Sequence, residues 1–371
     1  MDINATRTIR KLNVLAIAPV SDYGGFNTAT HRIESMIRLG ACVETLDSNY
    51  SRSTEQLVHW LLRLSQRLFR AGLSVRMPDV IGINKKMEAA AKSERWDMLW
   101  IDKGRLVTTA TLEGFRKDNP NCLIVGYSPD DMNSRPNQSR QFLEHLPLYD
   151  YFLTTKSYNV AELTKLGARN VVFIGNGYDA KSFRPLTPSA DDRRRLGGGV
   201  GFIGSFEPAR AASMAKIAAA GIPVRVWGDG WQRFGSTPKL MQVENKRLLG
   251  DDFALACCSF KINLGFLRKV NRDLQTTRSV EIPGCGAFML AERTDEHLDL
   301  FDEGAEAEFF GSDDELIQKC QYYLEHEDDR RRIAKAGLNR CESSGYDNDS
   351  RMNQIFDLVF ASGRVKTETT S

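Results

Sequence analysis

The chain has 371 residues, of which 42% are apolar and 26% charged, and its formal net charge is +2. This composition is typical of globular proteins, and the length favours two domains over one. The near-neutral charge excludes a broad positive field for nonspecific nucleic-acid binding. No apolar run reaches the roughly 18 residues of a membrane span, so we expect a soluble protein. The run at 14–20 is too short for a signal-peptide core, which predicts a cytoplasmic location.

The cysteines and histidines lack the spacing of a metal or disulfide site. Seven cysteines are spread through the expected strands and helices, and none forms a CxxC pair. The five histidines are equally dispersed, with no two of them four residues apart beside a carboxylate. We therefore expect reduced cysteines and no metal site built by the protein.

The first half alternates short apolar runs with segments of helical period. Strands are expected near 13–18, 42–46, 98–101, 123–127, 151–154 and 171–174, with helices such as 28–39 and 157–166 between them. This alternation is typical of βαβ units and predicts a doubly wound parallel sheet. A segment at 176–185 then breaks the pattern with a glycine and a proline, so we place the first domain at 1–185.

The second half repeats the pattern and predicts another Rossmann-like sheet. Strands are expected near 200–204, 224–227, 262–264, 287–290 and 308–310, and helices near 313–324 and 328–339. We assign 186–345 to the second domain. Residues 346–371 form a third segment, with an amphipathic helix near 350–361 and a polar tail from 364 to 371.

The segment 271–290 is the main candidate for a ligand site. Thr276 and Thr277 can open a helix whose free amides attract a diphosphate, and Arg278 adds a planar cation for the same anion. Glu281, about one turn later, can accept two hydrogen bonds from a ribose diol. The alternative is a capped helix with a solvated salt bridge and an ordinary glycine turn. The helix of this segment lies at the carboxyl end of a strand and has cations on both sides, which favours the ligand site.

Two loops of the second domain complete this candidate donor site. Gly204 and Ser205 follow its first strand, so their backbone can approach a diphosphate, and Arg210 lies in the first turn of the next helix. The alternative there is a tight turn with a surface arginine. After the second strand, Gly228, Asp229 and Gly230 stand between two tryptophans. Their backbone groups and an aromatic face can line a nucleobase, or they form only a turn.

In the first domain, Gly24 and Gly25 follow the first strand, where their backbone can approach a sugar or an acceptor. This is not the dinucleotide fingerprint, and the glycines at 197–201 precede a strand instead of following one, which disfavours an NAD enzyme. Asp130 and Asp131 follow the fourth strand. Either carboxylate can act as a base or position an acceptor hydroxyl, or the two only cap a surface turn.

The stretch near 57–70 can be interpreted in two ways. Its apolar face and its cations share two or three helical turns, with Leu57, Trp60, Leu61, Leu64 and Leu68 against Arg63, Arg67 and Arg70. Such a helix can lie on a membrane surface. More commonly the apolar face packs on the protein's own sheet, which is the interpretation we favour.

The stretch 278–337 closely resembles the CgeB-like (spore maturation) glycosyltransferases, which are related to glycosyltransferase family four. The resemblance is carried by RSVEIPGCGAFMLAERTDEHLDLF, by EFFGSDDELIQKCQYYLEHEDDRRRIAKAG and by the closing SGYDNDSRM. Upstream, YDYFLTTKSYNVAELTKLGARNV and GYDAKSFRP resemble the family's passage between its two domains. The resemblance is good from about 149 onward and weaker before that residue.

The resemblance implies a GT-B fold, with two Rossmann-like domains facing a cleft, a nucleotide-sugar donor and no catalytic metal. The family-four Glu-x7-Glu signature is matched by Asp273 and Glu281. In the family the second acid holds the ribose and the first contacts sugar hydroxyls, but here the first acid is the shorter aspartate. The family's Gly-Arg...Lys pair is replaced by Gly204-Ser205 and Arg210, so Arg210 or Arg278 must supply the charge.

These observations predict a metal-independent glycosyltransferase that uses no cofactor and, by resemblance, retains the anomeric configuration. The acceptor, whether a sugar, a lipid-linked molecule or a protein, is left open, as is the donor base. The alternatives are a non-catalytic nucleotide-sugar-binding scaffold of the same fold, to which Asp273 and Ser205 point, and a sugar-nucleotide epimerase.

Overall fold

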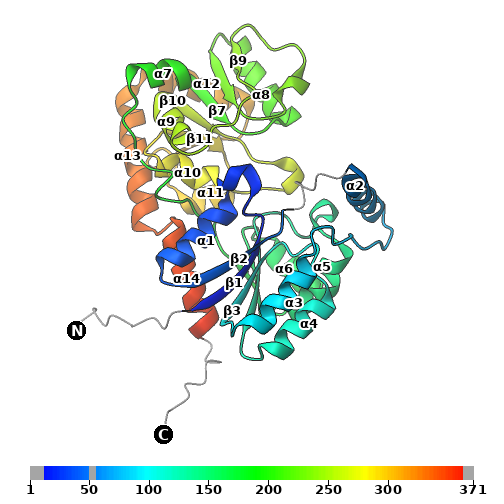
Figure 1. Cartoon of the computed structure of the whole chain (residues 1–371). Coiled ribbons are helices and arrows are strands. Elements are labelled where there is room, and N and C mark those ends of the chain that lie inside the picture. Colours follow the sequence, from blue (N-terminus) through cyan, green and yellow to red (C-terminus); the bar gives the residue numbers. More distant parts are fainter. Residues whose placement is uncertain (1–11, 50–55, 362–371) are drawn as a thin grey trace, which may run out of the picture. The chain divides into compact units, whose positions relative to one another are not determined.

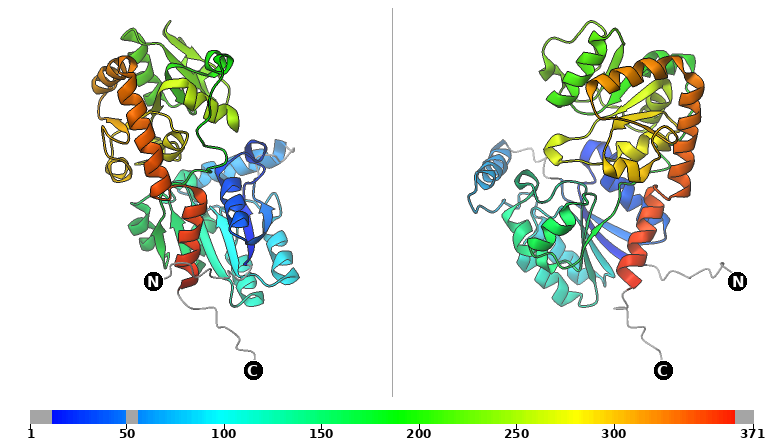
Figure 2. Two further views of the ribbon diagram at one scale, coloured as in Figure 1. Left: turned by 90° about the vertical axis from the view of Figure 1, so that its left-hand side faces the viewer. Right: turned by 180° about the vertical axis from the view of Figure 1, so that it is seen from behind.

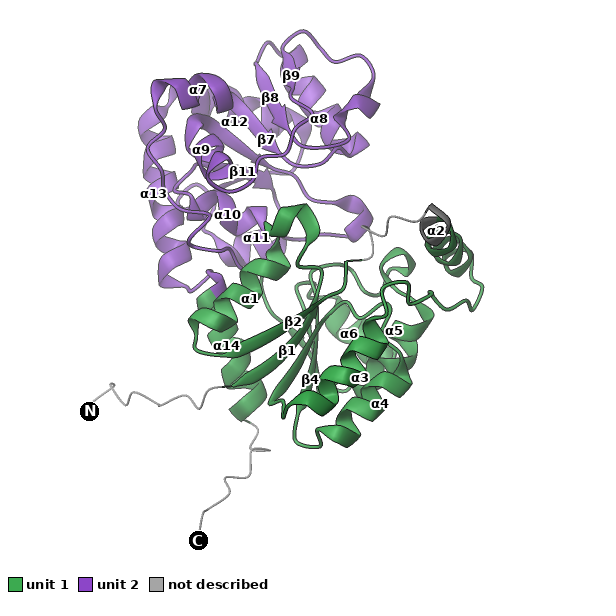
Figure 3. Ribbon diagram, in the orientation of Figure 1, with its two compact units in different colours: residues 1–175, 349–371 green, residues 176–348 purple. Residues whose placement is uncertain are grey.

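The chain forms two compact units (Figure 3). The structure, a computed structural model, describes residues 12–49 and 56–361, the side chains of the second range from Trp60 onward. Unit 1 comprises residues 1–175 and 349–371, and unit 2 comprises residues 176–348. The division at 175 lies ahead of the predicted boundary at 185. The C-terminal helix, which we placed in a separate segment from 346, belongs to unit 1.

Unit 1 contains a parallel sheet of six strands in the order β2-β1-β3-β4-β5-β6. The strands are β1 (Asn13–Ala18), β2 (Cys42–Asp47), β3 (Met98–Asp102), β4 (Leu123–Ser128), β5 (Tyr151–Thr154) and β6 (Val171–Phe173). In register, Val14 is paired with Val43 on one side and with Met98 on the other. All six predicted strands are confirmed, each within a residue of its predicted ends.

Helices cover both faces of this sheet (Figure 1). The helices of unit 1 are α1 (Thr28–Arg38), α2 (Gln56–Arg70), α3 (Ile83–Ser93), α4 (Thr109–Asp118), α5 (Arg140–His145), α6 (Asn159–Lys165) and α14 (Asn348–Ala361). Successive residues of a strand point to opposite faces, so β1 contributes to two cores. Leu15 and Ile17 pack with residues of α3, α4 and α5, whereas Val14 and Ala16 pack with residues of α1 and α14.

Unit 2 contains a second parallel sheet, in the order β12-β11-β10-β7-β8-β9. Its strands are β7 (Gly198–Ile203), β8 (Val224–Trp227), β9 (Met241–Val243), β10 (Phe260–Gly265), β11 (Met289–Glu292) and β12 (Glu308–Phe310). Strand β9 was not predicted, because its three residues, Met-Gln-Val, have a polar one in the middle and do not form an apolar run like those in the equally short β6 and β12. The predicted strand at 287–290 is present two residues further along the chain.

Helices also flank the second sheet, and two further views of the ribbon are given in Figure 2. They are α7 (Ala190–Leu196), α8 (Pro208–Ala219), α9 (Asp251–Ser259), α10 (Arg278–Gly284), α11 (Asp295–Leu300), α12 (Asp313–Glu325) and α13 (Glu327–Ser343). Within the described ranges, no helix has both the length and the apolar content of a membrane span. The strand orders and parallel pairing confirm the predicted class, two doubly wound α/β sheets.

Each sheet has one point where the direction of winding reverses. In unit 1 the chain runs from β1 outward to β2 and then returns to β3 on the other side of β1. In unit 2 it runs from β7 through β8 to β9 and then returns to β10 beside β7. Loops diverge at the carboxyl ends of such strands and leave a crevice, which is where open α/β sheets bind ligands. The residues after β1 and β3, and after β7 and β10, are therefore the places to look for a site.

The packing of α14 on the first sheet can be tested at Ile355, which is 2% exposed in the core with Val14 and Ala16. We expect Ile355→Ala to lower the free energy of unfolding by about 2 to 5 kcal/mol, because the deletion leaves a cavity. Asn353→Ala, on the exposed side of the same helix, is the control and should change it by less than about 0.5 kcal/mol. Equal urea midpoints for the two variants would contradict the packing of α14 on this sheet.

Candidate functional site

The turns after β7 and β8 are joined by three hydrogen bonds. The amide of Gly204 donates to the carbonyl of Trp227 at 2.8 Å, and that of Phe206 donates to the carbonyl of Asp229 at 2.9 Å. The indole Nε1 of Trp231 donates to the carbonyl of Gly204 at 2.9 Å. The structure thus brings two predicted groups of site residues together, Gly204-Ser205 and 228–230, at the carboxyl ends of neighbouring strands.

Gly228 makes this junction possible. A Cβ atom on Gly228 would lie 2.0 Å from the carbonyl oxygen of Gly204, and its φ of 142° is one that side chains rarely adopt. Gly230, in the left-handed region at φ 81°, begins the short helix that carries Trp231. The glycines of this segment are therefore needed for a close backbone approach and a turn, whether or not a ligand binds there.

Both tryptophans of this segment are buried, at 5% exposure for Trp227 and 1% for Trp231. The Trp231 ring packs edge-on against the rings of Phe202 and Phe206. The expected aromatic face for a nucleobase is therefore part of the core, a correction to the sequence analysis. Asp229 remains at the turn, where its carboxylate is paired with Arg247.

Arg210 is a buried cation beside a cavity. It lies in the first turn of α8, as predicted, and is 6% exposed. Its Nη1 donates to the carbonyl of Ser205 at 3.2 Å and its Nη2 to that of Phe266 at 3.3 Å, while its buried Nε has no hydrogen-bond partner. Within the part of the chain that is described, no carboxylate lies within ion-pair distance of Arg210. Burial lowers the pKa of its guanidinium, because desolvation disfavours the charged form.

The cavity beside Arg210 has a volume of about 400 Å³. It lies in the switch-point region of unit 2, where the direction of winding reverses between β9 and β10. It is bordered by the start of α8 and by the residues that follow β10, β11 and β12, among them Phe266, Leu267, Glu292 and Gly311. Two other cations near it are already neutralised. Arg268 contacts Glu207 at 3.0 Å, and Lys269 is paired with Glu292.

Helix α10 begins where the sequence predicted. The amide of Glu281 donates to the carbonyl of Thr277 at 2.8 Å, and the amide of Thr276 donates to the Ser279 hydroxyl at 3.0 Å. The helix ends at Gly284. A Cβ at this position would lie 2.8 Å from the Tyr178 ring, so a larger side chain would collide with that tyrosine.

The acid and the arginine of α10 form an ion pair. Glu281 is 2% exposed, and Arg278 Nη1 donates to its Oε2. Arg278 also donates from Nε to the carbonyl of Ile203 at 3.2 Å and lies over the Phe253 ring, 4.3 Å from its centroid. The salt bridge weighed as an alternative is therefore present. Its carboxylate is buried, however, so the pair is not the solvated surface contact considered there.

Asp273, the first acid of the predicted signature, stabilises the loop that precedes α10. It is 7% exposed, and its Oδ2 accepts a hydrogen bond from the amide of Arg268 at 3.3 Å. Its own amide donates to the Arg268 carbonyl at 3.2 Å. These contacts close the loop 268–273 into a compact turn, so Asp273 has a structural role in this loop.

His297 was not singled out in the sequence, yet it joins three elements of the site. Its Nε2 lies 2.7 Å from the Ser279 hydroxyl on α10, and its Nδ1 lies 2.6 Å from the carbonyl of Glu292 at the end of β11. Its ring stacks on Phe309 of β12, with a centroid separation of 5.4 Å. Burial lowers the pKa of His297, so the ring is a neutral structural bridge. The sequence did contain one indication of this position. Thr294 is a typical N-cap residue, and its hydroxyl accepts a hydrogen bond from the amide of His297 in the first turn of α11.

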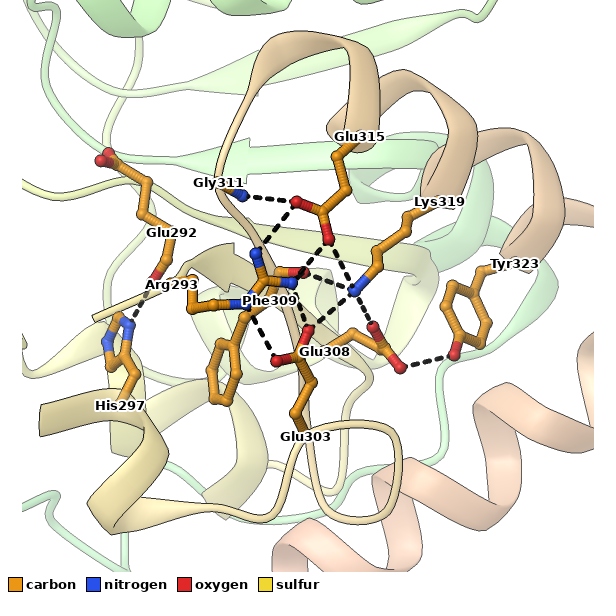
Figure 4. Close-up of polar contacts among 10 residues, drawn as sticks. All are labelled: Glu292, Arg293, His297, Glu303, Glu308, Phe309, Gly311, Glu315, Lys319 and Tyr323. Carbon is orange, nitrogen blue, oxygen red and sulfur yellow. Dashed lines mark hydrogen bonds and ion pairs between the residues drawn. The ribbon is translucent and has the colours of Figure 1, made fainter. Parts of the chain in front are cut away.

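A network of charges, whose contacts are drawn in Figure 4, includes Arg293 and Gly311 from the lining of the cavity. Arg293 contacts Glu303 and Glu315, and Lys319 contacts Glu308 at 2.6 Å. Hydrogen bonds from Arg293 are the main cause that lowers the pKa of Glu315 to about 2. The Gly311 amide also donates to Glu315, at 2.8 Å. These contacts hold the turn after β12, which lines the cavity, against α12.

Unit 1 has a smaller cavity, of about 250 Å³, at its own switch point. It is lined by residues that follow β1, β2 and β3, including Pro19, Asp22, Asn49, Lys103 and Arg105. The predicted Gly24 and Gly25 lie in the turn after β1, both in the left-handed region, at φ 70° and 91°. They do not line the cavity, although Asp22 of the same turn does.

The segment after β3 was missed in the sequence. Lys103 and Gly104 are both left-handed, at φ 61° and 62°, and a Cβ on Gly104 would lie 2.6 Å from the Tyr149 hydroxyl. Lys103 pairs with Asp130, one of the two predicted catalytic acids. A lysine at positive φ costs about 1 to 2 kcal/mol, and such strain is found at functional sites more often than elsewhere.

Asp131, the other predicted acid, is 1% exposed. Its Oδ1 accepts hydrogen bonds from Asn159 Nδ2 at 2.9 Å and from the amide of Asn133 at 3.1 Å. It thus holds the loop after β4 and does not line the cavity. Among the described residues, no three histidine, cysteine or acidic side chains are placed together so that they could hold a metal ion.

Comparison with known proteins agrees with this architecture. Residues 209–357 match a family model described as glycosyl transferase-like. No curated protein matches the chain significantly. Among solved structures, the chain is similar to HepE from Anabaena in complex with UDP-glucose, with a TM-score of 0.61 and 15% identity over 94% of this chain and 100% of that one.

Two further solved structures show the same fold. Sucrose-phosphate synthase from Thermosynechococcus elongatus has a TM-score of 0.65 and 13% identity, over 95% of this chain and 100% of that one. The α,α-trehalose 6-phosphate synthase from Burkholderia multivorans has a TM-score of 0.59 and 9% identity, over 95% of this chain and 99% of that one. The chain therefore has the GT-B fold, as predicted, with a glycosyl transferase-like region in its second half. The closer relation to CgeB-like proteins and to family four stays a prediction.

The contact between Gly204 and Gly228 leads to a stability prediction. We expect Gly228→Ala to destabilise the protein by about 2 kcal/mol or more, because the new methyl group must displace backbone. Gly221→Ala is the matched control in the same unit. Gly221 takes the left-handed position after the end of α8 at φ 86°, and no atom lies within 4 Å of the position that a Cβ would take, so only the cost of a left-handed alanine, about 1 kcal/mol, should remain. If both variants unfold at the same urea concentration, the junction is loose and the prediction is wrong.

Proposed function

We propose that this protein is a cytoplasmic glycosyltransferase, which binds a nucleotide-sugar in unit 2 and transfers the sugar to an acceptor. The proposal is supported by the glycosyl transferase-like region at 209–357 and by similar folds solved with UDP-glucose and with UDP and glucose. The observation that carries it is Arg210, a buried cation without a carboxylate partner among the described residues, beside a cavity in the switch-point region of its sheet.

A buried guanidinium is costly unless an anion and hydrogen bonds compensate it. Arg210 has two long hydrogen bonds to carbonyl groups and one buried nitrogen without a partner. A diphosphate in the cavity would supply the missing negative charge through charge-assisted hydrogen bonds. Arg278 is already neutralised by Glu281, so of the two candidates we assign the diphosphate to Arg210. The backbone at Gly204-Ser205 and the residues Thr276 and Thr277 complete the proposed phosphate site.

We assign the remaining donor contacts as the sequence predicts, to Glu281, Asp273 and 228–230, which do not themselves line the cavity beside Arg210. Arg278 contacts Oε2 of Glu281, and a carboxylate can accept several hydrogen bonds, so Oε1 can accept from the ribose diol. Asp273 would contact the sugar, and the backbone at 228–230 the nucleobase. In unit 1, Asp130 is paired with Lys103, which lines the switch-point cavity, and Asp130 is the proposed group for positioning the acceptor hydroxyl.

Transfer in this site would not require a metal ion. As the bond to the diphosphate breaks, negative charge develops on the leaving oxygen, and Arg210 with nearby backbone amides would stabilise it. Such donors are effective because they are oriented before the reaction and need not reorganise. We propose retention of the anomeric configuration, as in the family that the sequence resembles.

The role of Arg210 is tested by donor binding. UDP, GDP, dTDP and their sugars are screened by thermal shift, since a ligand at about 100 times its Kd stabilises by about 2.7 kcal/mol. For the donor that is found, Arg210→Ala should weaken binding on the order of 10- to 100-fold, because charge-assisted hydrogen bonds are lost. Lys216→Ala is the control. It removes a cation from the same helix, but one that is exposed and paired with Asp313. Equal affinities in the two variants would remove Arg210 from the site.

Turnover and its metal requirement form a second test. We expect hydrolysis or transfer of the identified donor to persist in EDTA and to fall at least about 100-fold in Glu281→Gln, which keeps the shape but lowers the charge. Loss on chelation that manganese restores would overturn metal independence. Donor binding without turnover across acceptors would favour the scaffold function. Product formed without any acceptor would favour an epimerase.

A further inference from the structure

The second helix of unit 1 exposes apolar side chains that we expected to pack on the sheet. Trp60 is 56% exposed, Leu61 41% and Leu64 37%. The side that does pack consists of Leu62, Ser65 and Phe69, all below 9% exposure. The predicted inward packing of this apolar face is therefore wrong for Trp60, Leu61 and Leu64, while Leu68 is half-buried. Leu57 of the predicted face lies outside the residues whose side chains are described.

The helical geometry explains this difference. At about 100° per residue, Trp60, Leu64, Leu68 and Leu61 span one arc of about 100°, and the buried residues occupy the next arc of about 60°. From Trp60 to Leu62 the two arcs together extend over about 200°, more than half of the helix circumference, which is wider than one packing contact can cover. The protein uses one part of the apolar surface for its own core and leaves the other part in contact with solvent.

The other border of the exposed apolar arc is cationic. Arg63, Arg67 and Arg70 are exposed and follow one another at helical spacing, on the side away from the buried arc. None of the three has a carboxylate within ion-pair distance among the described residues. The sequence from 56 to 78 contains no aspartate or glutamate at all. Leu73, which is 53% exposed, extends the apolar surface just beyond the helix.

Helix α2 is held from its inner side. Arg135 donates from Nε to the carbonyl of Phe69 at 3.2 Å, and its guanidinium lies over the Phe69 ring, 4.6 Å from the centroid. Arg140 donates to the carbonyl of Ser74 at 2.9 Å. Figure 1 shows α2 at the margin of unit 1, apart from the helices that cover the sheet. Its outer side, with the tryptophan, the leucines and the arginines, is thus left for a partner.

We propose that this outer side, the α2 surface (Trp60, Leu61, Arg63, Leu64, Arg67, Arg70 and Leu73), binds an anionic lipid bilayer. Tryptophan and leucine beside arginines are the composition of helices that lie in a bilayer interface. The indole and leucines would enter the boundary between headgroups and acyl chains, while the arginines would contact lipid phosphates. The proposal does not depend on the proposed transfer. If both hold, the acceptor would be lipid-linked.

Charge argues against two other occupants. A second copy of the chain, related by a two-fold axis, would bring two sets of arginines against each other. The chain's own terminal segments do not match the surface either, because residues 1–11 carry Arg7, Arg10 and Lys11 against one acid, Asp2. A bilayer with anionic headgroups supplies both the apolar phase and the negative charge that this surface lacks.

Vesicle flotation tests the proposal with the full chain and without donor. We expect binding to phosphatidylcholine vesicles that contain about 30% phosphatidylglycerol, little binding to phosphatidylcholine alone, and weaker binding at high salt. Trp60 gives a direct readout, because the other four tryptophans are at most 5% exposed. Its fluorescence should shift to shorter wavelength with anionic vesicles, and Trp60→Phe should lose that shift.

Matched variants separate the surface from general effects. Leu61→Ser with Leu64→Ser, and separately Arg63→Glu with Arg67→Glu, should each reduce vesicle binding at least about 10-fold. The controls are Leu166→Ser and Lys117→Glu, an exposed leucine and an exposed lysine elsewhere in unit 1, and both should bind as the wild type does. Unchanged melting temperatures would show that the variants fold.

Two results would overturn the proposal. One is absence of binding to both kinds of vesicle, or binding that the α2 variants do not reduce. The other is a dimer in sedimentation that the α2 variants dissociate, which would assign the surface to a second copy. Because no nucleotide-sugar is present in the assay, failure of the proposed transfer would not affect either outcome.

Discussion

The candidate donor site depends on a backbone contact between two glycines. Gly228 lies so close to the carbonyl of Gly204 that a side chain would not fit, and this contact joins the turns after β7 and β8. The same carbonyl accepts the Trp231 indole hydrogen bond, which anchors the junction in the core. Helix α8 starts directly after one of these turns. The junction therefore determines where Arg210, in the first turn of α8, enters the protein interior.

Charge is distributed unevenly around this junction. Arg268, Lys269 and Arg278 each have a carboxylate partner, whereas the hydrogen bonds of Arg210 go only to carbonyl groups among the described residues. A buried cation in that state stabilises the fold less than a hydrophobic residue of similar size would. Its presence is easier to understand when an anionic ligand binds there. The paired cations instead hold the loops that border the cavity, and His297 links α10 to β11 and β12 as a neutral bridge.

Unit 1 has an exposed surface on α2 that the candidate donor site does not explain. Helix α2 is apolar over more of its circumference than the fold can cover, and the uncovered part lies beside arginines without acidic neighbours in the sequence from 56 to 78. The switch-point cavity of the same unit is lined by Lys103 and Arg105 as well as Asp22. Candidate binding features are therefore present in both units, whereas the glycosyl transferase-like match covers residues 209–357.

The sequence by itself determined every described strand except β9, the parallel class of both sheets, and the starts of the helices that carry Glu281 and Arg210. These are local properties, since the period of apolar residues and the caps are set by neighbours along the chain. Only the tertiary structure decided which charges are paired, that Trp231 is in the core, that Asp131 supports a loop, that α14 belongs to unit 1 and which side of α2 is exposed. Each of these depends on contacts between residues distant in sequence, such as Asn159 with Asp131 or Val14 with Ile355. The pattern of residue types along the chain does not specify which distant residues come into contact.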